Sequence, residues 1–587
     1  MLMGRNIRLT LAVAAPLLCL GQTFQSVSGP YRADPKNVPA WAEQGNFRFI
    51  RLDGGRIESR KAARTWWGQN FTPAEKDVLS HIYDSEFDQM LGLLKKAQFN
   101  WIWVTWSNGW SIKDEEENRE NLRKVIARCH REGIQVSAYL SASNMFPEDD
   151  YRDDPETKKY GLWMHGIPMF YAGPTLTHLH ISWRRRLADA RNPNWRAYLI
   201  KKAEMAVDAG VDAIVWDNMI GYDDGLTQLL NETQRMAERK ALETGRPKVM
   251  VAANVHIPTD RFAMNDVNEV IWEEDGKDTP GVWNGRWQVE NARKIKFLAG
   301  EKQLWQPLIY ENDRYHCGTR ESCIPSPTEQ KLSTAEAYSF GAATSRNIEG
   351  RFLSALIEGE PDALNAWAAI AQYNHFLVEH HALYHQVTPA ARIALISAVP
   401  KNQLADEFLK RSVFFETKVL AHLDKGLPLN SFKVLVIPRD ILKFNSEQKV
   451  ILENFIAGGG IVIRAGRSDP TIAQRAEAAS RGPRLNLEPR GYVLGQLTCK
   501  PDGRALILHL LNYDQNAPAR NVKIRLELNG LVQDLSRWKV KVLSPDLPQP
   551  QLTGVSLHAG IAEFSLDRIE HYTVVTFSAD TALWSSP

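Results

Sequence analysis

Short apolar segments alternate with helix-like segments from about residue 46 to about residue 350, and this alternation constrains the fold more strongly than any other feature. Such a pattern is typical of a parallel sheet covered by helices. We count eight strand-like segments, and eight βα units in about 300 residues is the length of a (β/α)8 TIM barrel. The predicted strands are residues 47–52, 101–106, 134–140, 211–218, 249–254, 269–274, 304–310 and 342–348.

The fourth segment, Val-Asp-Ala-Ile-Val-Trp-Asp-Asn, carries a carboxylate and a carboxamide at its C-terminal tip. Parallel strands are buried on both faces, so an acid is expected only where the strand leaves the core. In α/β barrels the catalytic groups lie at that end of the strands. Asp217 is therefore the first catalytic candidate, and Asn218 beside it is a candidate for substrate binding.

Acids and carboxamides also end other predicted strands. Glu273 and Glu274 close the sixth strand, and Glu311 follows the seventh, so all three are catalytic candidates. Neighbouring residues on a strand face opposite ways, so only one of Glu273 and Glu274 is expected to point into the site. We prefer Glu274 because it is nearer the mouth. The other substrate-binding candidates are Asp53, Trp106, Asn108, Asn254, Trp272 and Asn312.

A long segment, about residues 141–191, contains glycine, proline and aromatic residues in place of regular periodicity. Insertions of this kind on a barrel usually shape the substrate site. His178 and His180 in this segment have the spacing of metal ligands, but they lack obvious carboxylate or lysine partners, so we expect no metal. No nucleotide or flavin motif is visible, since Gly458-Gly-Gly460 ends a helix and enters a strand. The sequence therefore predicts no cofactor.

The pattern changes after about residue 391. Residues 393–397, 434–437 and 461–464 are typical of buried strands, and the helix 446–457 ends at Gly458, which together indicate a second α/β domain. From about Tyr492 the sequence alternates polar and apolar residues, which predicts a small antiparallel β-sandwich. We divide the chain into a signal peptide (1–29), a catalytic barrel (30–388), the second α/β domain (389–483) and the sandwich (484–587).

The first residues have the order of a secretory signal peptide, with Arg5 and Arg8 before an apolar run and then small residues. The run is too short to span a bilayer, so we expect a secreted or periplasmic protein with no membrane anchor. An oxidising compartment allows a disulfide between Cys317 and Cys323, which bracket a five-residue loop. Cys129 and Cys499 lie in apolar contexts and are expected to be buried thiols.

Lys and Arg are interspersed with acids, and the formal net charge is +2, so there is no basic stripe for a nucleic acid. The chain has 18 tryptophans, and flat aromatic faces can stack on sugar rings, which favours a carbohydrate substrate. Packing in a core is the alternative for each of them. Those near predicted strand ends are Trp66, Trp67, Trp106, Trp110, Trp216, Trp272, Trp283 and Trp287.

A barrel, a flavodoxin-like domain and a small β-domain, in that order, resemble glycoside hydrolase family 42 β-galactosidases. The middle domain is similar to class I glutamine amidotransferases, but Val-Leu-Val-Ile-Pro, ending at Pro438, carries no nucleophile. The resemblance implies a catalytically silent, amidotransferase-like domain of the kind that often forms oligomers. A homo-oligomer formed through this domain is therefore one alternative for the oligomeric state.

The fourth strand departs from family 42, whose acid/base is a Glu after an Asn, because Asp217 stands there. An Asp at this place, preceded by Asp-Ala-Arg-Asn-Pro-Asn-Trp-Arg-Ala-Tyr-Leu at residues 189–199, resembles the α-glycosidase barrels, including α-galactosidases and α-N-acetylgalactosaminidases. That resemblance implies that Asp217 is the nucleophile and that the acid/base follows the sixth strand. The family 42 resemblance instead implies Glu311 as nucleophile, with Asp217 as acid or binding residue.

These observations predict an exported glycoside hydrolase that cleaves glycosidic bonds in an oligo- or polysaccharide with two carboxylates at the barrel mouth. Cleavage passes through an oxocarbenium-like state, so one carboxylate must stabilise or attack the anomeric carbon while a second, protonated one donates to the leaving oxygen. The two pKa values must therefore be pushed apart. Two alternatives are a carbohydrate-binding pseudoenzyme, because fold alone does not establish activity, and a metal-dependent hydrolase or deacetylase.

Overall fold

A computed structural model gives the structure of most of the chain. The described residues are 39–43, 45–53, 72–83, 85–107, 112–145, 163–164, 167–168, 170–171, 185–217, 219, 223–255, 269–274, 280–283, 285–299, 308–312, 323–398, 402–420, 423, 429–532 and 534–579. The predicted signal peptide lies outside them.

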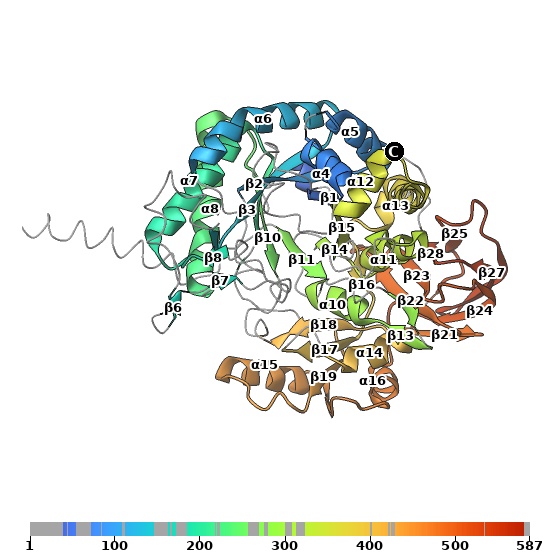
Figure 1. Ribbon diagram of the computed structural model, residues 1–587. Helices are drawn as coiled ribbons and strands as arrows, with labels where there is room; N and C mark the ends of the chain where they lie inside the picture. The colour runs from blue at the N-terminus through green and yellow to red at the C-terminus, as the bar shows by residue number, and fades with distance from the viewer. Residues whose placement is uncertain are drawn as a thin grey trace, which may run out of the picture.

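Eight parallel strands close into a barrel in the ring order β1-β15-β14-β11-β10-β9-β3-β2 (Figure 1). All eight predicted strands are confirmed, and the described bounds differ from the predicted ones by one or two residues at most of the strand ends. Residues 304–307 and 218, which were also assigned to strands, lie outside the described residues. The bounds are β1 Arg48–Asp53, β2 Trp101–Ser107, β3 Gln135–Ser141, β9 Ala213–Asp217, β10 Met250–Val255, β11 Glu269–Glu274, β14 Leu308–Asn312 and β15 Ala343–Glu349.

The strand residues divide between two buried layers, as alternation along a strand requires. One layer fills the inside of the barrel and includes Phe49, Trp101, Trp103, Tyr139, Val215, Met250, Ala252 and Ala343. The other packs against the surrounding helices and includes Ile50, Ile102, Val104, Val136, Leu140, Ile214, Val251, Ala253 and Ile348. The barrel therefore has a filled interior, and each strand position has a definite inner or outer face.

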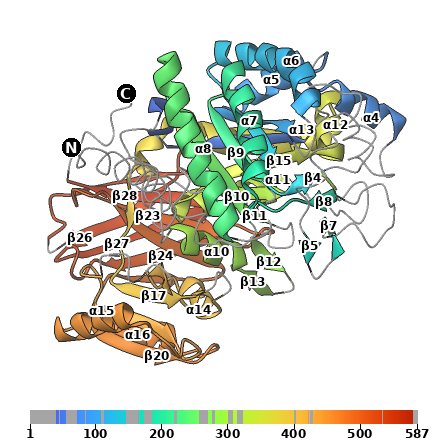
Figure 2. The same cartoon turned by 90° about the vertical axis from the view of Figure 1, so that its left-hand side faces the viewer.

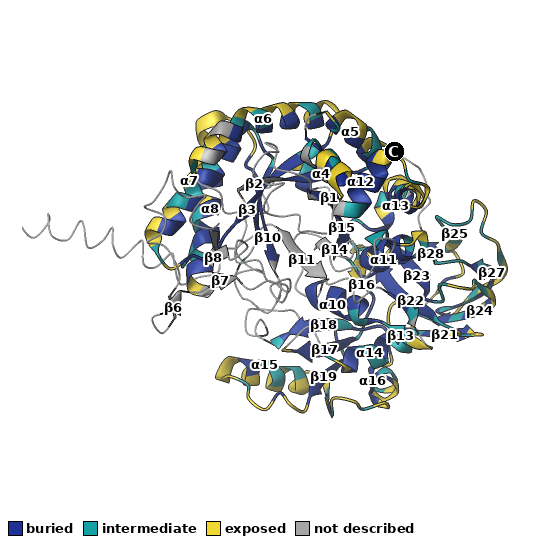
Figure 3. Cartoon of the chain, in the orientation of Figure 1, coloured by how far each residue is buried: buried dark blue, intermediate teal, exposed yellow. Residues whose placement is uncertain are grey.

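Helices surround the strands and bury the side that faces the barrel (Figure 3). Two of these helices are α5 (Phe87–Lys96) and α7 (Pro193–Ala209). Local signals set the ends of α7, since Asn192 caps its first turn, Pro193 opens it, and Gly210 ends it with φ of 110°. The helices are α2 Ala40–Glu43, α4 Pro73–Ser80, α5 Phe87–Lys96, α6 Ile112–Arg131, α7 Pro193–Ala209, α8 Asp223–Thr244, α10 Glu290–Ala299, α11 Pro327–Ser339, α12 Gly350–Glu358 and α13 Pro361–Glu379. None of the helices in the described ranges is long and apolar enough to cross a membrane.

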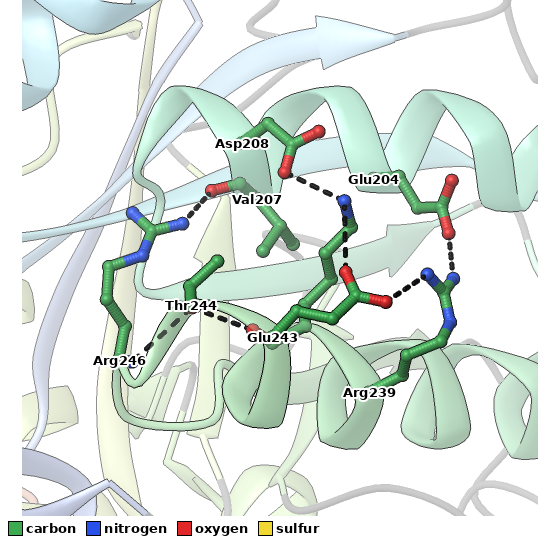
Figure 4. Close-up of polar contacts among 8 residues, drawn as sticks. Glu204, Val207, Asp208, Arg239, Glu243, Thr244 and Arg246 are labelled. Carbon is green, nitrogen blue, oxygen red and sulfur yellow. Dashed lines mark hydrogen bonds and ion pairs between the residues drawn. The ribbon is translucent and has the colours of Figure 1, made fainter.

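Ion pairs join α7 and α8 near their C-terminal ends (Figure 4). The Arg239 guanidinium binds Glu204 on α7 and lies 3.2 Å from Glu243 on its own helix, while Lys240 Nζ lies 3.0 Å from Asp208. Barrel helices run antiparallel to the strands, so their C-terminal ends lie near the N-terminal ends of the strands. This network therefore braces the end of the barrel opposite the predicted site.

The predicted insertion contains short strands among its described residues. β4 (Asn144–Met145), β8 (Arg185–Leu187) and β7 (Phe170–Tyr171) form one small sheet, and β5 (Trp163–Met164) pairs with β6 (Ile167–Pro168). The insertion follows β3, and the backbone N of Ala142 donates to the carbonyl of Asp217 at 2.8 Å, so the insertion begins beside the strand that carries Asp217.

A second, four-stranded parallel sheet follows the barrel in the chain, in the order β18-β17-β19-β20. The three predicted strands are confirmed, and β18 was not foreseen. The strands are β17 Ile393–Ser397, β18 Glu416–Val419, β19 Val434–Pro438 and β20 Ile461–Ala465, and the helices are α14 Leu404–Lys410, α15 Ser446–Ala457 and α16 Ile472–Ser480.

Two antiparallel sheets form the C-terminal part, in the orders β16-β22-β23-β28-β25 and β21-β24-β27-β26. Side chains of both sheets share one apolar core, for example Leu497 and Leu508 with Ile524 and Phe564, so the predicted antiparallel packing is confirmed. The exact division at residues 388 and 484 stays a prediction. The strands are β16 Thr388–Pro389, β21 Arg484–Glu488, β22 Val493–Cys499, β23 Ala505–Asn512, β24 Ala519–Glu527, β25 Lys539–Leu543, β26 Leu552–His558, β27 Ile561–Ile569 and β28 Tyr572–Ser578.

The three parts pack together through α10 and α11, and in Figure 2 α10 lies between the barrel strands β10 and β11 above it and α14 of the second parallel sheet below it. A buried carboxylate on α11, Glu336, joins the barrel to the sandwich, because it accepts hydrogen bonds from Tyr513 of the sandwich and from Asn291 Nδ2 of α10, the latter at 2.8 Å. One apolar cluster includes residues of all three parts. The barrel is therefore in contact with both of the other parts.

A buried lysine lies at the same junction. Lys296 on α10 donates from Nζ to Gln496 Oε1 at 3.2 Å, and Nζ lies 4.6 Å from the ring centroid of Phe415 and 5.4 Å from that of Phe340. Burial lowers the pKa of Lys296 to about 7, against a smaller opposing effect of Glu416. The junction therefore holds a cation at a cost in stability wherever the pH keeps it charged.

Lys296→Met is expected to abolish a pH dependence of stability between about pH 7 and pH 10.5. In that window the unfolded chain binds a proton that the folded protein lacks, so wild-type stability rises with pH. Below pH 7 the full penalty applies, at most about 5 kcal/mol for a shift of this size. Thermal unfolding of both proteins from pH 6.5 to pH 9.5 checks this, and equal slopes of Tm against pH would contradict it.

Candidate functional site

Asp217 is the last residue of β9, and every residue of this strand is buried. Its side chain is 6% exposed, and Asn254 Nδ2 on the neighbouring strand β10 donates to Asp217 Oδ1 at 3.2 Å. On the other side, Ser141 of β3 is its register partner. Two predicted site residues, Asp217 and Asn254, are thus in direct contact at the carboxyl ends of adjacent strands.

The register around the closed barrel assigns every strand-end residue to a face, because partners in parallel strands share a face. Starting from Asn254, the pairing runs to Ile271 on β11 and then to Leu308 on β14. Two positions further along β11 is Glu273, paired with Tyr310. Glu273 therefore has a position on the inner face, like Asn254 and Asp217.

Four more polar positions lie on the inner face at the same end of the barrel. Asn312 of β14 pairs with Asn347 of β15, and Asp53 of β1 pairs with Glu349 of β15. Asp53 and Asn312 were predicted as binding residues, whereas Glu349 was missed. Glu349 is identified by its pairing with Asp53, and strand pairing cannot be read from the sequence alone.

Trp272, Glu274 and Glu311 occupy positions on the outer face. Trp272 pairs with Val255, and Glu274 pairs with Glu311, which pairs in turn with Arg346. The side chain of Arg346 lies among the helices, where it binds Gln330 and Thr334 of α11. The register thus separates these three candidates from the face that Asp217 occupies.

Trp106, predicted to bind substrate, is instead a packing residue. It is fully buried in the layer between strands and helices, and its Nε1 donates to the carbonyl of Lys202 on α7 at 3.1 Å. Trp216 is buried in the same layer and donates to Thr233 Oγ1 at 3.1 Å. The prediction for Trp106 is wrong because Trp106 follows the alternation of Ile102 and Val104, which places its indole in the same outer layer.

Several predicted residues lie outside the described ranges. Cys323 is disulfide-bonded, and its predicted partner Cys317 is one of these residues, while Cys129 and Cys499 are free thiols. Among the described side chains, no group of three or more His, Cys, Asp or Glu could hold a metal ion. The remaining residues outside the description are Trp66, Trp67, Asn108, Trp110, His178, His180 and Asn218.

The inner face below the site is aromatic and holds one buried cation. Trp103 and Tyr139 stack with their ring centroids 4.5 Å apart, and the Arg51 guanidinium carbon lies 4.6 Å from the Trp103 centroid. Sequence reasoning missed all three residues as parts of the site, because they lie within strands and not at strand ends. The arrangement places aromatic rings and a positive charge on the face that carries Asp217.

Residues 110–244 match the family model described as glycoside-hydrolase family GH114. The match includes β3, α7 and β9 with Asp217, and it ends before β11. The enzyme is a glycosidase. No curated protein matches this glycosidase.

Solved structures similar to this glycosidase include the α-L-fucosidase isoenzyme 2 of Paenibacillus thiaminolyticus, with a TM-score of 0.63 and 13% identity. That alignment covers 91% of this chain and 100% of the other. A cycloisomaltooligosaccharide glucanotransferase of Paenibacillus sp. has a TM-score of 0.53 and 12% identity, with 91% of this chain and 85% of the other covered. At these identities the similarity shows the fold alone, and it extends beyond the barrel of the glycosidase to most of the chain.

Proposed function

We propose that the protein is an exported glycosidase that cleaves an oligo- or polysaccharide with Asp217 and Glu273 as its carboxylate pair. The observation that carries this proposal is the shared inner face of Asp217, Asn254 and Glu273 at the carboxyl ends of β9, β10 and β11. Catalytic groups of α/β barrels occur at this end. The match to family GH114 supports the reaction class.

The two acids have different roles in this proposal. Asp217 accepts a hydrogen bond from Asn254 Nδ2, which orients its carboxylate at the end of the strand, so we assign it to stabilise or attack the anomeric carbon. Glu273 is assigned to protonate the leaving oxygen. The register supports Glu273 over Glu274 and Glu311, which occupy outer-face positions. Asp53, Asn312 and Glu349 are assigned to bind sugar hydroxyl groups.

The reaction class is tested with purified wild-type protein and a panel of aryl α- and β-glycosides and polysaccharides. Release of aglycone or reducing ends from at least one substrate is expected, and the active aryl glycoside would also reveal the anomer. Binding of polysaccharides without any release of product would favour the carbohydrate-binding alternative and contradict the proposal.

We further propose that the second parallel sheet is a catalytically silent, flavodoxin-like domain of the amidotransferase type, in a family 42-like arrangement. Its strand order, with the first strand between the second and third, is that of flavodoxin-like sheets. β19 ends at Pro438, where the amidotransferase resemblance would require a nucleophile. We also propose that the glycosidase is exported through the predicted signal peptide.

We also propose that this domain joins two copies of the chain. β20 ends the sheet, and the neighbouring helix α15 has only Gln448 buried, while Val450 and Ile456 are each 53% exposed (Figure 3). Light scattering is expected to give a dimer for the wild type and a monomer for Ile456→Glu. Leu242→Glu, at a leucine on α8 that is 87% exposed, is the control and should remain dimeric. A monomeric wild type would contradict the proposal.

A further inference from the structure

We propose that two copies of the glycosidase join edge to edge through β20, so that their second parallel sheets form one continuous sheet across a two-fold axis. This inference rests on the dimer proposed above, and it goes beyond that dimer by naming the paired backbone groups and the register. The partner is a second copy of this chain, bound through backbone hydrogen bonds as in β-strand addition.

Alternate residues of β20 form the hydrogen bonds to its one neighbour, β19. The backbone N of Ile461 donates to the carbonyl of Lys433, and the backbone N of Arg439 donates to the carbonyl of Ala465. In a parallel ladder, the residues that bond to a given neighbour alternate along the strand. The backbone groups of Ile461, Ile463 and Ala465 therefore point toward β19.

The backbone groups of Val462 and Arg464 point to the opposite side. β20 is the last strand in the order of its sheet, so this side is the sheet edge. In Figure 2 the edge strand lies at the lower end of the molecule, away from the barrel. A row of N–H and C=O groups at such an edge is a template for a further strand.

Antiparallel pairing of two β20 strands about Ile463 satisfies all of these edge groups. In an antiparallel ladder, pairs that exchange two hydrogen bonds alternate with pairs that exchange none. A two-fold axis beside Ile463 places Val462 opposite Arg464 of the other copy, and each such pair exchanges two bonds. Ile463 then faces its own counterpart at the non-bonded position. Because arginine lies opposite valine, no like charges meet.

β20 is also the edge strand without the usual protection against pairing. Proteins protect edges with charged side chains, bulges, proline, short strands or a covering helix. β20 has five residues in regular register with β19 and contains no proline. The other edges of this sheet and of the two sandwich sheets are protected by α10 packed on β18, Pro389 in the two-residue β16, Lys539 and Lys541 on β25, Arg484 and Glu488 on β21, and the register shift between Thr553 and Ser556 on β26.

The one charged residue of β20 is turned back onto its own copy. Arg464 Nη1 donates to the carbonyl of Ile441 at 2.9 Å, and the guanidinium carbon lies 5.1 Å from the Phe444 centroid. Apolar side chains beside it are exposed, since Ile461 is 38% exposed and Ile456 on the adjoining helix α15 is 53% exposed. Pairing would therefore bury apolar surface as well as backbone groups, without burying an unpaired charge.

Cysteine cross-linking tests the register, in a Cys499→Ser background that removes the half-buried free thiol. Ile463→Cys is expected to link the two copies on mild oxidation, because Cα atoms at non-bonded positions lie about 4.5 Å apart. Val462→Cys is the matched control, since the same residue in the two copies would be separated by about 8 Å, beyond the reach of a disulfide. Non-reducing electrophoresis measures both. No link in Ile463→Cys, or equal links in both variants, would overturn the register.

Proline substitution tests the hydrogen bonds at the edge. Val462→Pro removes an N–H that points away from β19, so a folded monomer is expected in light scattering. Ile463→Pro removes an N–H that bonds to β19 and should lower Tm more than Val462→Pro does. A folded Val462→Pro protein that stays dimeric would contradict the pairing. Arg464→Pro, which removes the other N–H at this edge, replaces Val462→Pro if that variant does not fold.

These outcomes separate the edge pairing from the proposals on which it rests. A dimeric wild type without a cross-link in Ile463→Cys would keep the dimer and overturn the pairing through β20. A monomeric wild type would contradict both. Neither measurement requires hydrolysis of a glycoside, so a failure of the proposed reaction is detected separately.

Discussion

Asp217→Asn is expected to lower kcat/KM by on the order of 10³-fold or more while the protein stays folded. Asparagine fills the same volume beside Asn254 but can neither attack nor stabilise an oxocarbenium-like centre with a negative charge. A loss of 10³-fold corresponds to about 4 kcal/mol of transition-state stabilisation. Initial rates on the best aryl glycoside of the panel measure the effect.

A control for this substitution lies just before the other end of β9. Asp212 binds His130 Nε2 at 2.7 Å and accepts from the backbone N of Val136 at 2.7 Å, at the opposite end of the barrel. Asp212→Asn is expected to lower stability and to keep wild-type turnover. Full turnover in Asp217→Asn would remove Asp217 from the reaction.

A second large loss of activity is expected when Glu273, one of two adjacent acids on β11, is replaced. Glu273→Gln should lower kcat by about 10²- to 10⁴-fold on a substrate with a poor leaving group, because glutamine cannot donate the proton. Glu274→Gln should retain turnover within a few fold, since its register position is on the outer face. The two substitutions each remove one carboxylate at neighbouring positions. Any effect on kcat of removing a negative charge alone should therefore be the same in both variants.

A comparison of leaving groups sharpens this result. Glu273→Gln should affect an aryl glycoside with an acidic phenol much less than a polysaccharide, because an acidic phenol departs without protonation. Glu311→Gln provides a further comparison at the end of β14. A large loss in Glu274→Gln or Glu311→Gln, with little loss in Glu273→Gln, would mean that the acid is assigned to the wrong residue.

The sequence predicted the barrel well because its strands are short apolar segments that alternate regularly with helical segments. Asp217 and Asn254 could be predicted as neighbours because the carboxyl ends of parallel strands meet at one end of a barrel. β18 was missed because Glu-Thr-Lys-Val is short and mostly polar, so its buried state depends on contacts with α10 and not on its own composition.

The faces of the strands could not be predicted from the sequence. Glu273 and Glu274 differ by one position, and alternation tells them apart only when the register to β10 and β14 is known. Trp106 lies near the end of its strand, but it shares the outer face with Ile102 and Val104 and packs among the helices. Arg51 gave no signal because its partners, Trp103 and Tyr139, are far from it in the sequence.

The distance between the carboxyl groups of Asp217 and Glu273, in a crystal structure with an oligosaccharide bound, tests the central claim most directly. A separation of roughly 5 to 10 Å, with both groups facing one glycosidic oxygen, is the predicted result, and the value would also indicate retention or inversion. Carboxyl groups farther apart than this, or Glu273 turned toward the helices, would contradict it.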